Sequence, residues 1–458
     1  MSEVSLSSPY KDLDLAHGVE AVVVPDQWAE SGSIIYVEGS GIKVRDINGK
    51  EYLDASSCGL CSVVGYGNRE VADAAWDQMM KLHNSRSFGG VANIPKIKLA
   101  SKLAQVSPGL QRFIFENSGS DAVESTFKIA RFYWRQKGLD KYKIIHRDRS
   151  YHGSTLATMS ACNPGLDNSD FAPFAPGFVS IPTPYCYRCP LDESYPSCEI
   201  ACAQALEQAI ETEGEDTVAA FIGEGVVGSE GFIPPPPEYW PKVRAICTKH
   251  NVLMIMDEVI TGFGKTGKFW AYQHWNVIPD LMTSSKGISS GYVPMSAVGI
   301  TENVYRGMTE KNKPFPHLHT FTGHPVACAI SLKVIEIMER ENLVERAATL
   351  GAYVKDRLMA LKEKSPYVGD VRVLGLMQGI ELVADKGSKK RFDPEKQIGI
   401  RVSRLAREKG VLYGSVGDDI MLMCPTPTTT MDEMDQILDV VEWSIMQIDR
   451  ILSSGDIE

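Results

Sequence analysis

The chain has 458 residues, of which 43% are hydrophobic and 23% charged, ordinary globular values that exclude a disordered, collagen-like or coiled-coil protein. Its net charge of -11 comes without any basic block, which argues against nucleic acid or a membrane surface as partner and favours small solutes. The opening segment has no basic stretch before an apolar run, no apolar run is long enough to span a membrane, and the 10 cysteines are scattered, so we expect a cytoplasmic protein with reduced thiols.

The first part of the chain predicts a β-hairpin followed by two helices. Residues 34–54 (IIYVEGSGIKVRDINGKEYLD) contain β-rich runs that are separated by the turn sequences GSG and NGK. Residues 68–84 and 94–109 then place apolar residues at helical spacing, and the second segment ends on a Pro-Gly turn.

Strands and helices alternate in the next part of the chain. The alternation predicts a largely parallel sheet with helices on both faces, and ligands of such sheets bind at the carboxyl ends of the strands. The pattern indicates an irregular stretch after residue 148. The expected strands are 112–118, 142–148, 217–225, 252–259, 281–286 and 296–300, and the expected helices are 120–138 and 237–251.

The last part of the chain changes character. A long helical region at 323–366 leads into strands near 371–383, 410–415 and 420–427 and a closing helix at 431–452. We therefore predict a large domain at 76–330 and a smaller α+β domain at 331–458, with residues 1–75 belonging to the smaller one.

Two polar features lie where predicted strands end. The segment FENSGSDAVE (115–124) runs from a strand into a helix, so the amides of Gly119 and Ser120 can cradle a phosphate; ordinary N-capping by Ser118 or Ser120 is the alternative. The strand VLMIMDEV (252–259) ends in acids, and Asp257 is either a solvated loop residue or a carboxylate aimed into a site.

Two further residues, Tyr151 and Lys286, are candidates for the same site. Tyr151, in RSYHGST, can stack on a planar ligand or simply pack. Lys286 stands among small residues in DLMTSSKGISSG, where the backbone can approach a ligand closely and where an amine can act as a nucleophile. A phosphate cradle, an aromatic ring, an acid and a lysine together are what pyridoxal 5'-phosphate (PLP) requires: the acid pairs with the pyridinium nitrogen and the lysine forms a Schiff base.

At these residues the sequence resembles the class III, ω-type aminotransferases of the aspartate aminotransferase superfamily. The likeness runs nearly end to end, through DINGKEYLD, NSGSDAVE, YHGST, DEVITGFGKTGKFW, DLMTSSKGISSG and HTFTGHPVACA, in order. The resemblance implies an α/β protein of PLP fold type I, like aspartate aminotransferase, whose large domain holds the cofactor.

The resemblance also implies roles for individual residues. Lys286 matches the lysine that bonds to PLP and moves the substrate proton, and Asp257 matches the partner of the pyridine nitrogen. Around the ring and phosphate, the matching residues are Tyr151 and Val259 on the two ring faces, Ser118, Gly119 and Ser120 at the phosphate turn, the site glutamate Glu224, and Thr320, which reaches the phosphate of the neighbouring subunit. The last contact implies a homodimer, or a dimer of dimers.

The sequence departs from the family at positions that bear on substrate. Members that act on α-amino acids grip the carboxylate with an arginine, where this chain has Leu422, so pyruvate is favoured over 2-oxoglutarate as acceptor. A family tryptophan is replaced by Cys61, which opens the pocket to ω-amino acids, amines or aminosulfonates such as taurine and β-alanine. Further candidates for the pocket wall are Trp28 and Phe88, and Arg86 is either a partner for a distal acid group or a surface residue.

Two questions stay open at this stage. Cys186, Cys189, Cys198 and Cys202 begin with a C-x-x-C spacing, but the later spacings do not match a common zinc pattern, so no metal site is predicted. The chemistry expected is transfer of an amino group to a keto acid; the alternatives are a PLP-dependent aminomutase or epimerase, and a catalytically silent PLP-fold binding protein.

Overall fold

The computed structural model describes residues 9–162, 168–417 and 419–454. Its strands are β1 (Tyr36–Ser40), β2 (Lys43–Asp46), β3 (Glu51–Asp54), β4 (Arg112–Glu116), β5 (Lys143–Arg147), β6 (Phe178–Ile181), β7 (Val218–Glu224), β8 (Leu253–Asp257), β9 (Leu281–Ser284), β10 (Ser296–Ile300), β11 (Val368–Leu374), β12 (Met377–Leu382), β13 (Val411–Leu412), β14 (Gly414–Val416) and β15 (Ile420–Met423).

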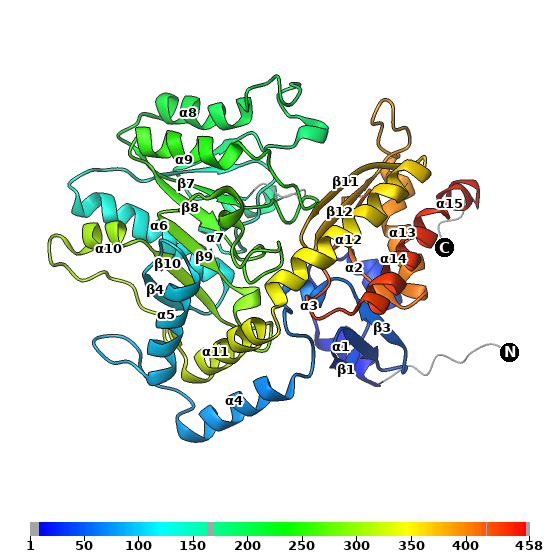
Figure 1. Cartoon of the computed structure of the whole chain (residues 1–458), viewed down its shortest axis with the longest axis horizontal. Helices are drawn as coiled ribbons and strands as arrows, with labels where there is room; N and C mark the ends of the chain where they lie inside the picture. The colour runs from blue at the N-terminus through cyan, green and yellow to red at the C-terminus, as the bar shows by residue number, and fades with distance from the viewer. Residues whose placement is uncertain (1–8, 163–167, 418, 455–458) are drawn as a thin grey trace.

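Helices connect and cover these strands (Figure 1). They are α1 (Pro9–His17), α2 (Pro25–Ser31), α3 (Ser57–Leu60), α4 (Arg69–Lys81), α5 (Ile94–Val106), α6 (Gly119–Gln136), α7 (Leu156–Met159), α8 (Ala201–Glu213), α9 (Tyr239–Lys249), α10 (Glu302–Thr309), α11 (Pro325–Arg340), α12 (Leu343–Lys364), α13 (Ile398–Glu408), α14 (Met431–Ile445) and α15 (Ile448–Ser454).

The central feature is a seven-stranded sheet of order β4-β10-β9-β8-β7-β5-β6. The pairs from β9 to β6 are parallel, whereas β10 runs antiparallel to both of its neighbours. The predicted, largely parallel sheet is therefore confirmed. Because β10 is reversed, its first residue, Ser296, lies at the same edge as the last residue of β4, Glu116.

Both faces of this sheet are buried, which is why its strands read as continuous apolar runs. All seven residues of β7 are buried. Side chains on one face pack with α6 and α10, and those on the other pack with α5, α8, α9 and α11. Phe221 and Ile222 illustrate the alternation, because these consecutive residues belong to the cores on opposite faces.

The two ends of the chain meet away from this sheet. Strands β1, β2 and β3 form an antiparallel unit that β13 extends in parallel, so residues near 53 and 411 are neighbours. A second small sheet has the order β11-β12-β15-β14. Figure 1 shows the blue, orange and red segments together on the right of the view. The exact division into domains stays a prediction.

The segment after residue 148 was expected to be irregular, and this expectation is wrong. It contains β6 and α8. Strand β6 pairs with β5 at the edge of the large sheet, and α8 buries Ala203, Leu206 and Ile210 on one face. The short apolar run of β6 is interrupted by a serine, and its pairing with β5, not its own composition, fixes it as a strand.

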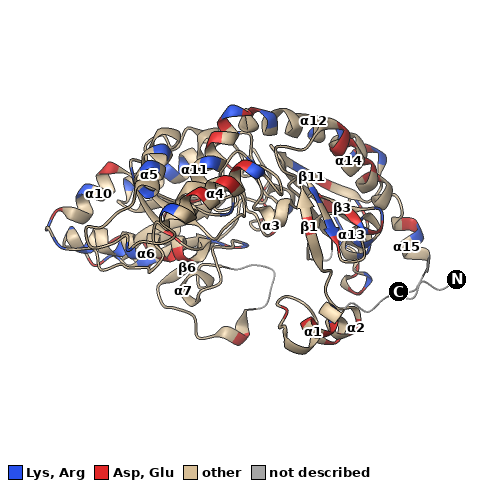
Figure 2. Cartoon of the chain, turned by 90° about the horizontal axis from the view of Figure 1, so that it is seen from below, with Lys and Arg blue, Asp and Glu red and all other residues tan. Residues whose placement is uncertain are grey.

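The surface of the C-terminal helices carries charges of both signs. Figure 2 shows acidic and basic residues interspersed along α12 and α14. Arg357 on α12 makes ion pairs with Asp435 and Asp439 on α14, which ties the two helices together. Within the described ranges, no helix is both long and apolar enough to cross a membrane.

Candidate active site

Neighbouring strand ends place three polar side chains at one edge of the sheet. Glu224 and Asp257 end β7 and β8 and stand opposite each other in the register of these strands, and Asp257 in turn stands opposite Thr283 of β9. Lys286 follows β9 directly. Because parallel strands bring their carboxyl ends to a single edge, residues that are distant in sequence converge here.

Asp257 is buried and receives three hydrogen bonds. Oδ1 accepts from the amide of Val259 (3.0 Å) and the hydroxyl of Thr283 (3.1 Å), and Oδ2 lies 2.7 Å from Nδ1 of the buried His152. These three contacts hold the carboxylate in a fixed orientation at the base of the site.

Lys286 lies in a short 3-10 helix with φ of 38°, an unusual backbone conformation for a residue other than glycine. Burial lowers the pKa of its amine, a shift that Cys61, Asp257 and Glu224 partly oppose. Burial therefore favours the neutral amine, which is the form that acts as a nucleophile or base.

The turn before α6 contains the predicted N-cap and also borders a cavity. Ser118 is the N-cap, and its hydroxyl accepts a hydrogen bond from the amide of Asp121 (3.2 Å). Gly119 and Ser120 line a cavity at the start of the helix. A Cβ on Gly119 would stand 3.1 Å from Cγ1 of Val259, so the small residue keeps this part of the cavity open.

The loop that carries Tyr151 is fixed by its neighbours. The amide of Tyr151 donates to Oε1 of Glu224 (3.3 Å), and the amide of Ser154 donates to the hydroxyl of Ser120 (3.0 Å). Burial raises the pKa of Glu224. The other carboxylate oxygen of Glu224 accepts from the amide of Gly228 (2.7 Å), so this residue braces two loops beside the cavity.

The cavity measures about 160 Å³ and collects most of the predicted site residues. Ser118 and Thr320 are not among the residues that line it: Ser118 is exposed at the cap, and Thr320 is exposed on the loop before α11. The lining residues are Gly119, Ser120, Tyr151, His152, Gly153, Glu224, Asp257, Val259, Ile260, Thr261, Ser285 and Lys286.

The candidates for the pocket wall lie outside this lining set in the part of the chain that the structure describes. Arg86 is exposed and its guanidinium lies over the ring of Phe88, at 5.7 Å. Trp28 donates its indole hydrogen to Ser33. Cys61 is half-buried, and its Cβ lies 3.0 Å from where a Cβ on Gly291, in the loop after Lys286, would stand.

These features have a counterpart among known proteins, because a model of the family described as aminotransferase class-III matches residues 25–445. The chain belongs to the class III aminotransferases. A taurine–pyruvate aminotransferase of Bilophila wadsworthia is 37% identical over 431 residues, which are 91% of this chain and 93% of that protein. A diaminobutyrate–2-oxoglutarate transaminase of Halomonas elongata is 36% identical, over 92% of each chain.

Solved structures agree with this assignment. An omega transaminase from Pseudomonas jessenii, solved in complex with PMP, superposes with a TM-score of 0.93 at 32% identity and covers 98% of this chain and 100% of its own. This class III aminotransferase therefore has PLP fold type I, and its cofactor is PLP.

The residues of the cavity fit this cofactor. Asp257 offers a buried carboxylate for a protonated ring nitrogen, and Lys286 offers a buried amine for the carbonyl carbon. Gly119 and Ser120 leave backbone amides at a helix N-terminus, where an anionic phosphate is stabilised. Tyr151 and Val259 line the same cavity as apolar contacts for a planar ring.

Five lining residues escaped the sequence reasoning: His152, Gly153, Ile260, Thr261 and Ser285. His152 was passed over as part of YHGST, although it lines the cavity and lies 2.7 Å from Asp257. Its Nε2 is buried without a hydrogen-bond partner, so the ring acts through Nδ1 alone. Its position next to Tyr151 was the one indication that the sequence offered. Only the fold reveals that the ring of His152 points at Asp257.

Proposed function

We propose that this class III aminotransferase moves an amino group from an ω-amino acid, an amine or an aminosulfonate such as taurine or β-alanine to a keto acid, with pyruvate as the preferred acceptor. The main support is the residue at the position where α-amino acid enzymes carry an arginine: Leu422, on β15, which is packed against an apolar core. Aminotransferases of both acceptor classes are similar to this chain, so residues at the site must decide between them.

Arg372 supports the same conclusion. Arg372 on β11 pairs with Gly379 on β12, which pairs with Leu422 on β15, so Arg372 lies two strands away from Leu422. Its Nη1 lies 2.8 Å from Asp370 and 3.0 Å from Glu381, and its Nε donates to the carbonyl of Gly231. An arginine held by two buried or half-buried acids is not available to grip a substrate carboxylate.

In the proposed reaction the chain's own residues bind the substrate and move protons. PLP supplies an electron sink for the substrate carbon when it is bound. Asp257 would hold the protonated ring nitrogen through an ion pair, and His152 holds Asp257 in place. The neutral amine of Lys286 would take up and release the proton of the substrate carbon in both half-reactions, the first of which releases the deaminated donor and the second of which delivers the amino group to the keto acid.

We further propose a homodimer in which Thr320 of one subunit contacts the cofactor phosphate of the other. Thr320 is exposed, and its neighbours Leu318 and Phe321 expose 59% and 53% of their surface. The helices α4 and α5, which pack on α11 (Figure 1), also present apolar side chains, including Trp76 and Ile94 with 67% and 68% exposed. A large apolar face of this kind is typical of a permanent interface. A dimer of dimers and a cytoplasmic location stay predictions.

A panel of donors and acceptors tests the proposed reaction. The donors are taurine, β-alanine, 4-aminobutyrate, putrescine and 1-phenylethylamine, each with pyruvate and with 2-oxoglutarate. We expect turnover with pyruvate to exceed turnover with 2-oxoglutarate for at least one donor. A preference for 2-oxoglutarate would overturn the acceptor assignment. Product formation without any keto acid would indicate an aminomutase or epimerase instead.

A further inference from the structure

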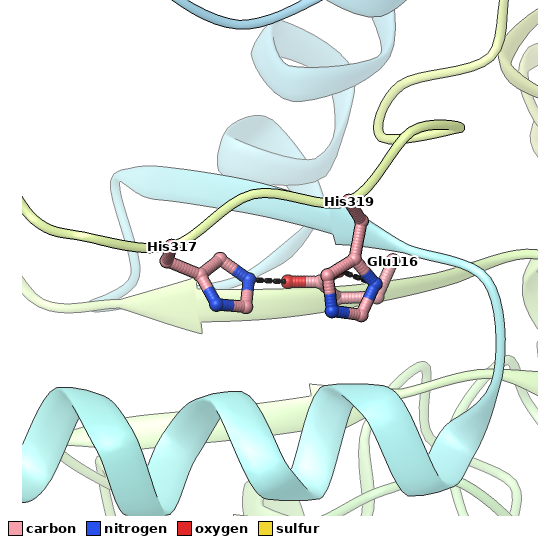
Figure 3. A group of neighbouring side chains, drawn as sticks. All are labelled: Glu116, His317 and His319. Atoms are coloured by element: carbon pink, nitrogen blue, oxygen red, sulfur yellow. Dashed lines mark hydrogen bonds and ion pairs between the residues drawn. The ribbon is translucent and has the colours of Figure 1, made fainter.

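We infer that Glu116, His317 and His319 form a binding site for a divalent transition-metal ion, outside the cofactor cavity. Figure 3 shows the two imidazole rings, from the loop that precedes α11, directed at the carboxylate at the end of β4. One ligand atom from each residue can be chosen so that all lie within 4.8 Å of one another. This group could not be recognised in the sequence, because Glu116 and His317 are 201 residues apart.

The carboxylate at the centre of the group is buried and only partly satisfied. The side chain of Glu116 is 0% exposed, and Oε1 accepts from the hydroxyl of Ser125 (2.9 Å) and lies 2.6 Å from Nε2 of His317. Oε2 lies 3.0 Å from Nδ1 of His319 but receives no well-aligned hydrogen bond. A buried carboxylate is costly unless it is paired or coordinates a metal.

Two imidazoles and one carboxylate are a ligand set that zinc uses when a fourth position is left to water. His317 is 6% exposed and His319 is 27% exposed, so the open side of the site faces solvent past His319. Metal bonds of about 2.0–2.1 Å at tetrahedral angles separate ligand atoms by about 3.3 Å. The distances of 2.6 Å from His317 to Oε1 of Glu116 and 3.0 Å from His319 to Oε2 are each within 1 Å of this value, and one ligand atom from each of the three residues lies within 4.8 Å of the others.

Binding at His317 requires a change of tautomer. The ammonium of Lys128 donates to Nδ1 of His317 (2.8 Å), so in this arrangement the ring proton is on Nε2 and is shared with Glu116. A metal at Nε2 moves that proton to Nδ1, and Lys128 must turn away. Lys128 is exposed and can do so at little cost.

The location suggests what the ion does. Glu116 is two residues before Ser118, the cap of the phosphate turn, and His319 immediately precedes Thr320. The same loop is also held to β4 by Thr322, whose hydroxyl donates to the carbonyl of Phe115 (2.6 Å). A metal here therefore fastens the loop that carries Thr320 to the strand that leads into the phosphate turn.

The test uses tag-free holoprotein dialysed against a chelator and then titrated with Zn²⁺, with bound metal measured by plasma mass spectrometry after gel filtration. We expect one Zn²⁺ per chain, and a loss of affinity of at least about 100-fold in both Glu116→Gln and His319→Gln, since even outer partners of a metal ligand are worth about 10- to 100-fold. Glu116→Gln alters a buried side chain. His319→Gln alters a loop side chain that is 27% exposed, so it tests the site even if Glu116→Gln fails to fold.

The matched control is His250→Gln. His250 belongs to the other described group of this kind, with Glu207 and Glu211, but Glu207 already accepts from the ammonium of Lys249 (2.7 Å). This variant should keep the wild-type stoichiometry and affinity. Lys128→Met should bind Zn²⁺ more tightly than the wild type, because nothing then opposes the change of tautomer in His317.

X-ray absorption at the zinc edge distinguishes this site from the free thiols of Cys186, Cys189, Cys198 and Cys202. We expect nitrogen and oxygen ligands at about 2.0–2.1 Å and no sulfur at about 2.3 Å. Sulfur ligation, unchanged zinc binding in Glu116→Gln and His319→Gln, or the absence of stoichiometric binding by the wild type would each overturn the proposal.

Discussion

Replacing His152 by phenylalanine should slow transamination and weaken cofactor binding without unfolding the protein. The change keeps the ring but removes the Nδ1 donor that lies 2.7 Å from Asp257. Asp257 retains the donors Val259 and Thr283 but leaves a buried Oδ2 unpaired. A hydrogen bond to a charged group is worth about 1.5–3 kcal/mol. We therefore expect a loss of about 10- to 100-fold, since 1.4 kcal/mol is tenfold.

The assay is the half-reaction with an amino donor and no acceptor, followed by stopped-flow absorbance, together with equilibrium dialysis of the cofactor. His152→Asn offers an amide donor close to the position of Nδ1 and should recover most of the rate. His146→Phe is the matched control, because His146 is also buried but its ring hydrogen-bonds to the carbonyl of Arg147 (3.1 Å) and not to Asp257. Rates and cofactor affinity within threefold of wild type for His152→Phe would refute the role of this contact.

Three further changes test other parts of the site. Lys286→Ala should abolish transamination and the covalent adduct that borohydride reduction traps at this residue, as peptide mass spectrometry reports, while the oligomeric state is unchanged. Asp257→Asn should bind PLP more weakly and slow the half-reaction by at least about 100-fold, because the amide cannot pair with a protonated ring nitrogen; near-normal rates would exclude that pairing. Lys265→Met should raise the free energy of unfolding near pH 7 by up to about 3 kcal/mol, since burial lowers the pKa of this unpartnered amine from 10.5 to about 8. Between pH 8 and pH 10.5 the unfolded chain binds more protons than the folded chain, so the stability of the wild type rises with pH across this range. The stability advantage of Lys265→Met therefore disappears at high pH. Urea unfolding of both proteins near pH 7 and near pH 10 measures this difference.

Periodicity was enough to predict the strands and helices that are buried on two faces or on one long stripe. Strands β7 and β8 are uninterrupted apolar runs, and α6 begins at a small-residue turn and buries one whole face. Strand β6 carries no such pattern, since only its last residue is buried. Its existence depends on pairing with β5, which is a tertiary contact that local sequence does not encode.

The same distinction separates the site residues that could be predicted from those that could not. Residues near the ends of predicted strands, such as Asp257 and Lys286, could be placed at the sheet edge from the order of elements alone. His152 could not, because it lies in a loop whose direction is set by the hydrogen bonds of Tyr151 to Glu224 and of Ser154 to Ser120. Which loop residue faces the cavity depends on those contacts between distant segments.

The cavity and the cluster of Glu116, His317 and His319 have the same origin, because the sheet brings the ends of several strands to one edge. Parallel strands deliver Glu224, Asp257 and Lys286 to a single edge, and the reversed strand β10 brings Ser296 to the same edge, where its hydroxyl donates to the carbonyl of Ser118 (2.7 Å). Glu116 ends the strand next to β10, so an acid at that position is carried to the same edge but lies beyond the cavity lining. The loop before α11 covers it, and an acid buried in this way needs a cationic or protonated partner. The partner of Glu116 lies between Ser118, at the phosphate turn of its own subunit, and Thr320, which we propose reaches the cofactor of the other subunit. Whether this partner is a metal ion or a protonated side chain therefore affects both cofactor sites.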